Sequence, residues 1–200
     1  MHAKPSLQAV LCLASGSPRR RELLTQIGVP HVTRAADIDE ALRPGELPRR
    51  YVVRLAREKA LAIRCTGEPL PVLAADTTVV LDGVIYGKPR DRQEGLQMLT
   101  QLSGRTHQVL TGVALAHGAA VGLRLSVSAV GMRALTPEEC AAYWDTGEPC
   151  DKAGGYGIQG YGAVFIRSLR GSHSGVMGLP LKETADLLRA AAIPYWLGSP

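Results

Sequence analysis

The chain has 200 residues, of which 46% are apolar and 4% aromatic, and its formal net charge at pH 7 is +5. This length and composition are typical of one ordinary domain, or one domain with two lobes, and they argue against a low-complexity chain. The positive charge favours an anionic partner without choosing among a nucleotide, a nucleic acid and a membrane surface. The four cysteines form no Cys-x-x-Cys pair, so we expect reduced thiols in a cytoplasmic protein rather than a disulfide framework or a zinc site.

The first structural signal is the short apolar run at residues 9–14, AVLCLA, which predicts a buried strand. Ser17 and Pro18 then suit the N-cap and N1 positions of a helix that Gly28 ends. The opening segment has a lysine and an apolar stretch, as a signal peptide does, but Gln8 interrupts the stretch and three arginines follow it. We therefore expect the first strand of the fold here, and no run is long enough to span a membrane.

The next signals predict a helix followed by a hairpin. A helix is expected from Pro48 to about Arg64, because apolar residues recur at helical spacing behind a proline at its first position. Residues 72–88 predict two strands around a tight turn at Asp82 and Gly83. The first of these strands is almost wholly apolar, which is typical of a strand buried on both faces.

The second half alternates helices with strands. Asp91 is expected to cap a helix over residues 92–102, residues 106–135 are strand-rich with one turn near residue 118, and Thr136 begins a capping box with a helix to about residue 146. A glycine-rich loop at residues 150–163, a strand at 163–169 and a last helix at 181–191 complete the pattern. Since hairpins are mixed with alternating strands and helices, we expect an α/β fold on a mixed sheet, with two lobes around a cleft.

Three charged residues break the local patterns, and such positions often mark function. Asp76 lies inside an apolar strand, where a carboxylate is costly unless it is paired; the alternative is a strand-end aspartate that faces solvent. Lys59 falls at the centre of the apolar stripe of its helix, and the alternative is a lysine that snorkels past the edge of the stripe. Lys88 would come close to Asp76 and Thr77 across a tight hairpin, or it is an ordinary basic loop end.

The segment LASGSPRRRELL, residues 13–24, joins the first predicted strand to the first predicted helix. Such a turn offers free backbone N–H groups and the positive end of a helix dipole to an anion. Arg19 and Arg20 add guanidinium donors that suit phosphate oxygens, and Ser15 adds a hydroxyl. The segment is neither a Walker A loop nor a G-x-G-x-x-G motif, so a solvated helix start remains the alternative.

Acidic residues offer a site for a divalent cation. Asp37, Asp39, Glu40 and Asp76 could supply the oxygen ligands that Mg²⁺ takes alongside water and substrate phosphates. A stretch such as DIDE, residues 37–40, is also common in solvated loops, and the sequence alone leaves both interpretations open.

Taken together, these segments resemble the Maf family of nucleoside triphosphate pyrophosphatases, the septum-formation-inhibitor-like proteins. The resemblance covers almost the whole chain and rests on the following segments in this order: LASGSPRRRELL, DIDE, VVRLAREKA, AADTTVVLDG, GKPRD, LSGRTHQVLTGVAL, DKAGGYGIQG and GLPL. It implies a single domain over residues 1–200, with a core at 8–190 and short flexible ends. It also implies an elongated α/β fold around a deep cleft, similar to inosine-triphosphate pyrophosphatases.

The resemblance assigns a role to each candidate residue. The family hydrolyses a nucleoside triphosphate to the monophosphate and pyrophosphate with a divalent cation, here expected to be Mg²⁺ or Mn²⁺, and is often dimeric. By motif match, Asp76 is the catalytic carboxylate, and Lys59 and Lys88 bind phosphates and offset developing charge. A phosphate cradle is formed by Ser15, Arg19 and Arg20. Glu40 is the additional acidic residue at the metal, together with Asp76.

Three positions indicate the branch of the family. The dTTP/UTP branch has arginine, threonine and glutamine where the branch resembling 7-methyl-GTP pyrophosphatases tends to have tryptophan, glutamine and glutamate. This chain has Arg19, Thr77 and Gln159, so we expect dTTP and UTP as substrates, with modified pyrimidine nucleotides also admitted. A neutral glutamine amide can pair with both the carbonyl and the N–H of a uracil edge.

Alternatives from other classes remain. A 7-methyl-GTP-type pyrophosphatase would keep the chemistry and change the base. A nucleic-acid-binding module would suit the positive charge, but aromatic residues for base stacking are few, so we expect no nucleic-acid partner. A regulator of cell division that acts through protein contacts is the third alternative. We expect a cytoplasmic homodimeric enzyme that binds a nucleoside triphosphate and no membrane.

Overall fold

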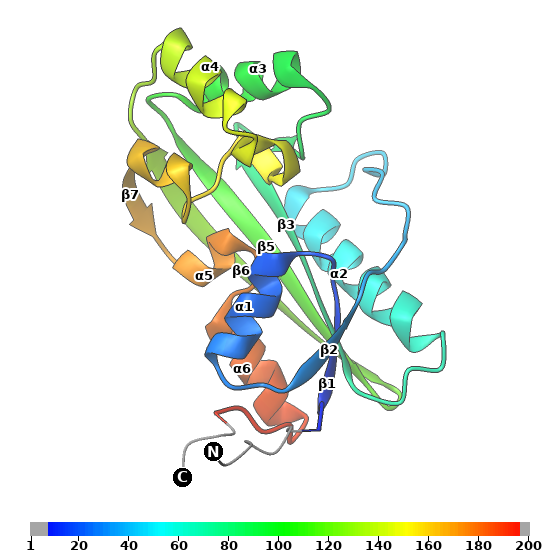
Figure 1. Ribbon diagram of the computed structural model, residues 1–200. Helices are drawn as coiled ribbons and strands as arrows, with labels where there is room; N and C mark the ends of the chain where they lie inside the picture. Colours follow the sequence, from blue (N-terminus) through cyan, green and yellow to red (C-terminus); the bar gives the residue numbers. More distant parts are fainter. Residues whose placement is uncertain (1–7, 197–200) are drawn as a thin grey trace, which may run out of the picture.

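A computed structural model describes residues 8–196 as a mixed seven-stranded sheet with helices on both faces (Figure 1). The sheet order is β2-β1-β3-β5-β6-β7, and β4 pairs with β3 beside this path. Strands β2, β1 and β3 are parallel, whereas β3, β5, β6 and β7 pair antiparallel. The expected mixed sheet with flanking helices is therefore present. Of the ends predicted to be flexible, 1–7 and 191–200, residues 1–7 and 197–200 lie outside the described residues.

The strands and helices have the following bounds. The strands are β1 Leu11–Ala14, β2 His31–Arg34, β3 Val72–Leu81, β4 Val84–Tyr86, β5 Thr106–His117, β6 Ala120–Met132 and β7 Ile166–Arg170. The α-helices are α1 Pro18–Gln26, α2 Pro48–Arg64, α3 Arg92–Leu102, α4 Pro137–Asp145, α5 His173–Met177 and α6 Leu181–Ala190. Three short 3-10 helices are η1 Glu148–Asp151, η2 Ala153–Gly155 and η3 Tyr161–Phe165.

Alternation along β1 shows how the layers form. Leu11 and Leu13 belong to a core shared with α1 and α6, whereas Cys12 and Ala14 pack with α2 on the opposite face. Successive side chains of a strand point to opposite faces, so a wholly apolar strand must be covered on both sides. A third core joins the far ends of β3, β5 and β6 to α3 and α4, at the top of Figure 1.

Local signals explain most helix boundaries. The helix α2 has its predicted bounds, the Asp91 side chain accepts a hydrogen bond from the Glu94 N–H at the start of α3, and Thr136 and Glu139 form the expected capping box of α4. Ser17 occupies the N-cap of α1, but its side chain makes no capping bond. Instead, the Ser17 N–H donates to Ser15 Oγ at 3.1 Å.

Three predictions need correction. The strand expected at 163–169 begins only at Ile166, because residues 161–165 coil into η3. The glycine-rich stretch at 150–163 contains the end of η1, all of η2 and the start of η3 rather than being wholly loop. Strand β2 and helix α5 were not predicted: β2 is largely exposed and only four residues long, and α5 spans five residues, too few for a helical pattern.

The path of β1 and β3 creates the site. These parallel neighbours are paired only at Cys12–Val72 and Leu13–Leu73, after which β1 ends and the chain turns into α1. In open α/β sheets, ligands bind beyond the carboxyl ends of parallel strands. Helix α2 lies unusually close to β5 here, since a Cβ at Gly112 would collide with the Val52 carbonyl.

Two further expectations concern membranes and thiols. Among residues 8–196, no helix is long and apolar enough to cross a membrane. All four cysteines are free thiols; Cys12 and Cys140 are buried, and Cys65 and Cys150 are exposed.

Candidate active site

A cavity of about 610 Å³ opens beyond the end of β1. Its walls come from the turn before α1, from α2, from the middle of β3 and from residues 151–159 of the glycine-rich segment. Five cations and three carboxylates line it. The nine residues to which the family resemblance assigns roles lie in its wall: Ser15, Arg19, Arg20, Glu40, Lys59, Asp76, Thr77, Lys88 and Gln159. The other two acidic candidates, Asp37 and Asp39, do not line it.

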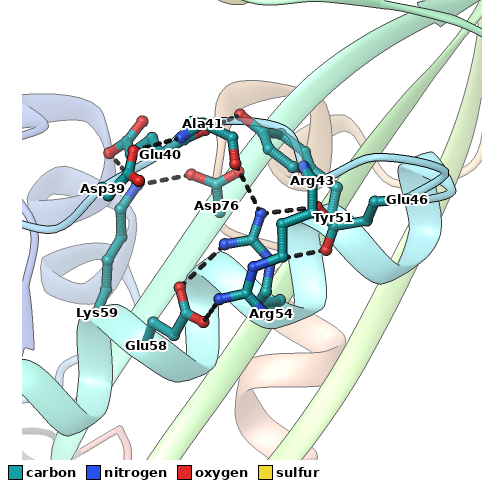
Figure 2. Close-up of polar contacts among 10 residues, drawn as sticks. All are labelled: Asp39, Glu40, Ala41, Arg43, Glu46, Tyr51, Arg54, Glu58, Lys59 and Asp76. Atoms are coloured by element: carbon teal, nitrogen blue, oxygen red, sulfur yellow. Dashed lines mark hydrogen bonds and ion pairs between the residues drawn. The ribbon is translucent and has the colours of Figure 1, made fainter.

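Lys59 joins two of the four acidic candidates, Glu40 and Asp76 (Figure 2). Its Nζ lies 2.6 Å from Asp76 Oδ1 and 2.7 Å from Glu40 Oε1. Lys59 and Asp76 are 8% and 6% exposed, so the snorkelling lysine and the solvent-facing aspartate are both wrong. The buried face of α2 thus contains one charged side chain, Lys59, because its partner Asp76 lies on β3 of the sheet against which α2 packs.

The protonation of Asp76 reflects opposing influences. Burial raises the pKa of its carboxyl above the ordinary value, while the charges of Lys59 and Arg20 act in the opposite direction. Glu40, a second carboxylate close by, raises the pKa further. A divalent cation bound at the two carboxylates would favour the ionised form of Asp76.

Two residues of α2 position Glu40, and the sequence did not single them out. The Tyr51 hydroxyl donates to the Glu40 carbonyl at 3.0 Å, and Arg54 Nη2 donates to the Ala41 carbonyl at 3.1 Å (Figure 2). Arg54 is itself fixed by Glu46, whose pKa it lowers to about 2 through a short hydrogen bond. The signal was present in retrospect: Tyr51 and Arg54 lie one turn apart on one face of α2.

Arg20 forms the centre of the predicted cradle. Its guanidinium donates to Ser15 Oγ and to Thr77 Oγ1, each at 3.3 Å, and its Nε donates to the Gly178 carbonyl at 2.8 Å. Thr111 Oγ1 donates to the Gly175 carbonyl, so the proton between Thr77 and Thr111 belongs to Thr77.

This chain of hydrogen bonds has two consequences. It holds the Arg20 guanidinium in one orientation. It also makes Thr77 Oγ1 the acceptor of a hydrogen bond from that guanidinium, because the Thr77 proton is directed at Thr111. Burial lowers the pKa of Arg20, yet the group stays charged because a guanidinium titrates far above neutral pH.

Arg19, Lys88 and Gln159 lie around the mouth of the cavity. Arg19 Nη1 is 3.1 Å from Asp151 Oδ2, which ties the start of α1 to η1. Lys88 is exposed and lies two residues after the end of β4. It lines the same cavity as Asp76, although the pairing of β4 with β3 ends before it, at Tyr86. Gln159 is exposed in the cavity wall.

The structure also adds residues that sequence patterns did not indicate. Asp151 and Lys152 lie in the wall of the cavity, and Lys152 Nζ is 2.7 Å from Asp151 Oδ1. Their approach to Arg19 spans more than a hundred residues of sequence, so no local pattern could reveal it.

The fold and this cavity define a mixed α/β protein with a cationic, carboxylate-containing site beyond its parallel strands. Residues 10–191 match the family model described as "Maf-like protein". The chain therefore belongs to the Maf family.

Its relatives are similar over nearly their full length. The chain is 51% identical over 199 residues to a protein of Saccharophagus degradans, covering 98% of this chain and 95% of the relative. It is 52% identical over 198 residues to one of Alkalilimnicola ehrlichii, covering 96% and 98%. It is 53% identical over 179 residues to one of Escherichia coli O157:H7, covering 89% and 91%. Each of the three is named dTTP/UTP pyrophosphatase.

A solved structure, "Structure of a HAM1 protein from Coxiella burnetii", aligns with a TM-score of 0.43 and 19% identity. The alignment covers 62% of this chain and 73% of that one. A match this loose supports no statement about the present protein.

Proposed function

We propose that this chain hydrolyses dTTP and UTP to the nucleoside monophosphate and pyrophosphate. The observation that carries the proposal is the buried Asp76–Lys59 pair, which the exposed Glu40 joins and which shares one cavity with the arginine cradle. A carboxylate beside a cationic phosphate site is what water attack on a phosphoanhydride requires. The relatives named dTTP/UTP pyrophosphatase, at 51–53% identity, support the same reaction.

The reaction we propose is an in-line attack of water on the α-phosphorus. A bond forms between the water oxygen and phosphorus, and the bond from phosphorus to the bridging α–β oxygen breaks as pyrophosphate leaves. Asp76 orients the water and receives its proton. The charges of Lys59 and Lys88 offset the charge that develops on the phosphate oxygens, while Ser15, Arg19 and Arg20 hold the phosphates.

The residues present suit a divalent cation, Mg²⁺ or Mn²⁺. Glu40 and Asp76 lie close to each other, since each has an oxygen within 2.7 Å of Lys59 Nζ. Among residues 8–196, no three His, Cys, Asp or Glu side chains gather as a complete ligand set. Mg²⁺ commonly takes one or two carboxylates and completes its shell with water and substrate phosphates. Bound there, the cation would act as a Lewis acid on the phosphate.

Base choice would depend on Gln159 and on the cradle. The Gln159 amide can donate to one group of a uracil or thymine edge and accept from another. Thr77 would act on selectivity through Arg20, because its own proton is directed at Thr111. Arg19 would act from the mouth of the cavity, where Asp151 holds it. A glutamate at position 159 would suit a base that offers donors, as in 7-methyl-GTP.

The remaining expectations complete the proposal. We expect a cytoplasmic homodimer that forms a single domain around a deep cleft and uses neither nucleic acid nor a membrane as a partner. A separate role in cell division is tested by an inactive variant: if a division phenotype persists when the active site is destroyed, that role does not depend on hydrolysis.

The first experiment measures pyrophosphate release from canonical and modified nucleoside triphosphates with Mg²⁺, with Mn²⁺ and with a chelator. Metal-dependent release from dTTP and UTP, with little from CTP and purine nucleotides, is the expected result. Release from 7-methyl-GTP instead would keep the reaction and overturn the base choice. No release from any of them would refute the proposed function.

A further inference from the structure

The segment at residues 157–162, which carries Gln159, is folded around a single carboxylate. Glu148 Oε2 accepts a hydrogen bond from the Tyr161 N–H at 2.8 Å, and Glu148 Oε1 accepts one from the Gly162 N–H at 3.1 Å. The Tyr143 hydroxyl donates to the same Oε1 at 2.7 Å. Three donors thus converge on one side chain that lies outside the cavity wall.

Gly157 and Gly160 have no room for a larger residue, because the Glu148 carboxylate lies against their backbone. A Cβ at Gly160 would collide with Glu148 Oε2, and a Cβ at Gly157 would lie 2.8 Å from Glu148 Oε1. Neither glycine has a positive φ, so their requirement is space rather than backbone conformation. Two glycines of the Gly-x-x-Gly-x-Gly pattern therefore leave room for Glu148, whereas a Cβ at Gly162 would meet the Gly157 carbonyl and the Tyr143 hydroxyl.

Gln159 is fixed from both sides by this arrangement. On one side, the Gly157 N–H donates to the Tyr143 hydroxyl at 2.9 Å; on the other, two backbone N–H groups donate to Glu148. Ile158 is buried, whereas Gln159 is exposed toward the cavity. The hydrogen bonds among the described residues leave the Gln159 amide without a partner. Its position therefore depends on its backbone.

The carboxylate is well suited to this task. Burial alone would raise the pKa of Glu148, but the hydrogen bonds from Tyr143 and from the two backbone N–H groups outweigh it, and the pKa lies below its usual value. Charge-assisted hydrogen bonds of this kind are about twice as strong as neutral ones. The Glu148 carbonyl also accepts from Lys152 Nζ at 2.7 Å, next to the Asp151 that binds Arg19.

We infer that Glu148 is a positioning residue for base selection: its carboxylate holds the segment at residues 157–162 so that the Gln159 amide meets the edge of the pyrimidine. The inference rests on the proposed function for the identity of the substrate. The structural link between Glu148 and Gln159 does not depend on the proposed function. An experiment can therefore refute the proposed function and this inference separately.

The test compares Glu148→Gln with a matched control, Glu139→Gln. The glutamine keeps the shape of the side chain but replaces one accepting oxygen with an NH₂ group, which cannot accept from a backbone N–H. Glu139 also receives three hydrogen bonds, from two nitrogens of Arg133 and from the Thr136 N–H, and none of them comes from the 157–162 segment. Both variants lose similar bonds, and only one of them affects the segment.

Three readouts separate positioning from general destabilisation. Amide hydrogen exchange over residues 157–162 is measured without nucleotide and is expected to accelerate in Glu148→Gln alone. The KM for dTTP and UTP is expected to rise about tenfold in that variant while kcat stays within about twofold, as for a lost binding contact. The preference for UTP over CTP, measured by kcat/KM and by Kd with chelator present, is expected to fall about tenfold.

Each outcome decides the inference. Faster exchange with unchanged base preference overturns it, and so does an equal loss of preference in both variants. If the wild type hydrolyses none of the nucleotides, the proposed function fails, and the Kd values alone judge the inference; unchanged or absent base preference in those values overturns it. If Glu148→Gln does not fold, Tyr143→Phe takes its place, because it removes the bond to Gly157 and one of the three donors to Glu148.

Discussion

Asp76→Asn is the variant that tests the proposed chemistry most directly. The substitution preserves the size of the side chain and removes its charge, so the Lys59 ammonium loses a partner at 2.6 Å and keeps Glu40 at 2.7 Å. Removing one partner of a buried ion pair costs about 3–5 kcal/mol when the remaining charge is left alone. Because Glu40 still neutralises Lys59, we expect a loss below about 3 kcal/mol, which a domain of ordinary stability tolerates.

The effect on turnover should be larger than the effect on folding. A positioned general base contributes about 10²–10⁴-fold to a rate, which corresponds to about 3–5 kcal/mol of barrier. The Arg20 cradle contacts Ser15, Thr77 and Gly178 and does not depend on a hydrogen bond to Asp76, so nucleotide binding should persist.

The assay combines three measurements on Asp76→Asn and on Asp82→Asn, a control at the end of the same strand. Asp82 pairs with Arg105 on the surface, and its side chain is 69% exposed. We expect the free energy of unfolding from urea titration to fall by less than about 3 kcal/mol in Asp76→Asn and to stay near the wild-type value in Asp82→Asn. The Kd for dTTP should stay near the wild-type value in both variants. Pyrophosphate release should collapse only in Asp76→Asn. Turnover within tenfold of wild type in that variant would refute the assignment of Asp76.

Other predictions address selectivity, acid stability and thiol exposure. Gln159→Glu should lower kcat/KM for dTTP and UTP by about tenfold or more while sparing other nucleotides, because a carboxylate cannot donate; an equal loss for all bases would make Gln159 merely structural. Burial lowers the pKa of His107 to about 4. In this pH range His107 binds a proton in the unfolded chain but not in the folded chain. The free energy of unfolding should therefore fall by about 2.5 kcal/mol as the pH is lowered from about 6.5 to 4.5. The substitution His107→Gln should abolish this fall. Urea titration at each pH would contradict this if the free energy stayed constant. A chromogenic disulfide reagent should react with two thiols in the folded protein, those of Cys65 and Cys150, and with four in denaturant. The buried thiols should not react in the folded state, where burial raises the pKa of Cys12 to about 11. Reaction of four thiols in the folded protein would contradict this structure.

Elements with strong local signals were predictable from the sequence. Helix α2 begins at Pro48 and carries its apolar stripe without interruption except at Lys59, and the α4 capping box announces itself within four residues. The same logic identified Asp76 and Lys59, because a charge inside an apolar pattern must find a partner or a ligand. What the pattern could not say was that each is the partner of the other, since that depends on the close approach of α2 to the sheet at Gly112.

Contacts between distant segments were beyond such reasoning. The Arg19–Asp151 pair joins residues 132 positions apart. Glu148 binds the backbone of residues 157–162, whose sequence GIQGYG contains no charged side chain that would indicate a carboxylate partner. In both cases the local sequence does not reveal the interacting group. Every residue except proline has a backbone N–H, and nothing near Asp151 or Glu148 in the sequence distinguishes either carboxylate from other acidic residues. The glycines at 157, 160 and 162 are the exception, because each leaves room for a neighbour that sits on it. A glycine without a positive φ is thus a reason to look for the side chain that excludes a Cβ, and here that search leads from the segment that carries Gln159 to Glu148 and Tyr143.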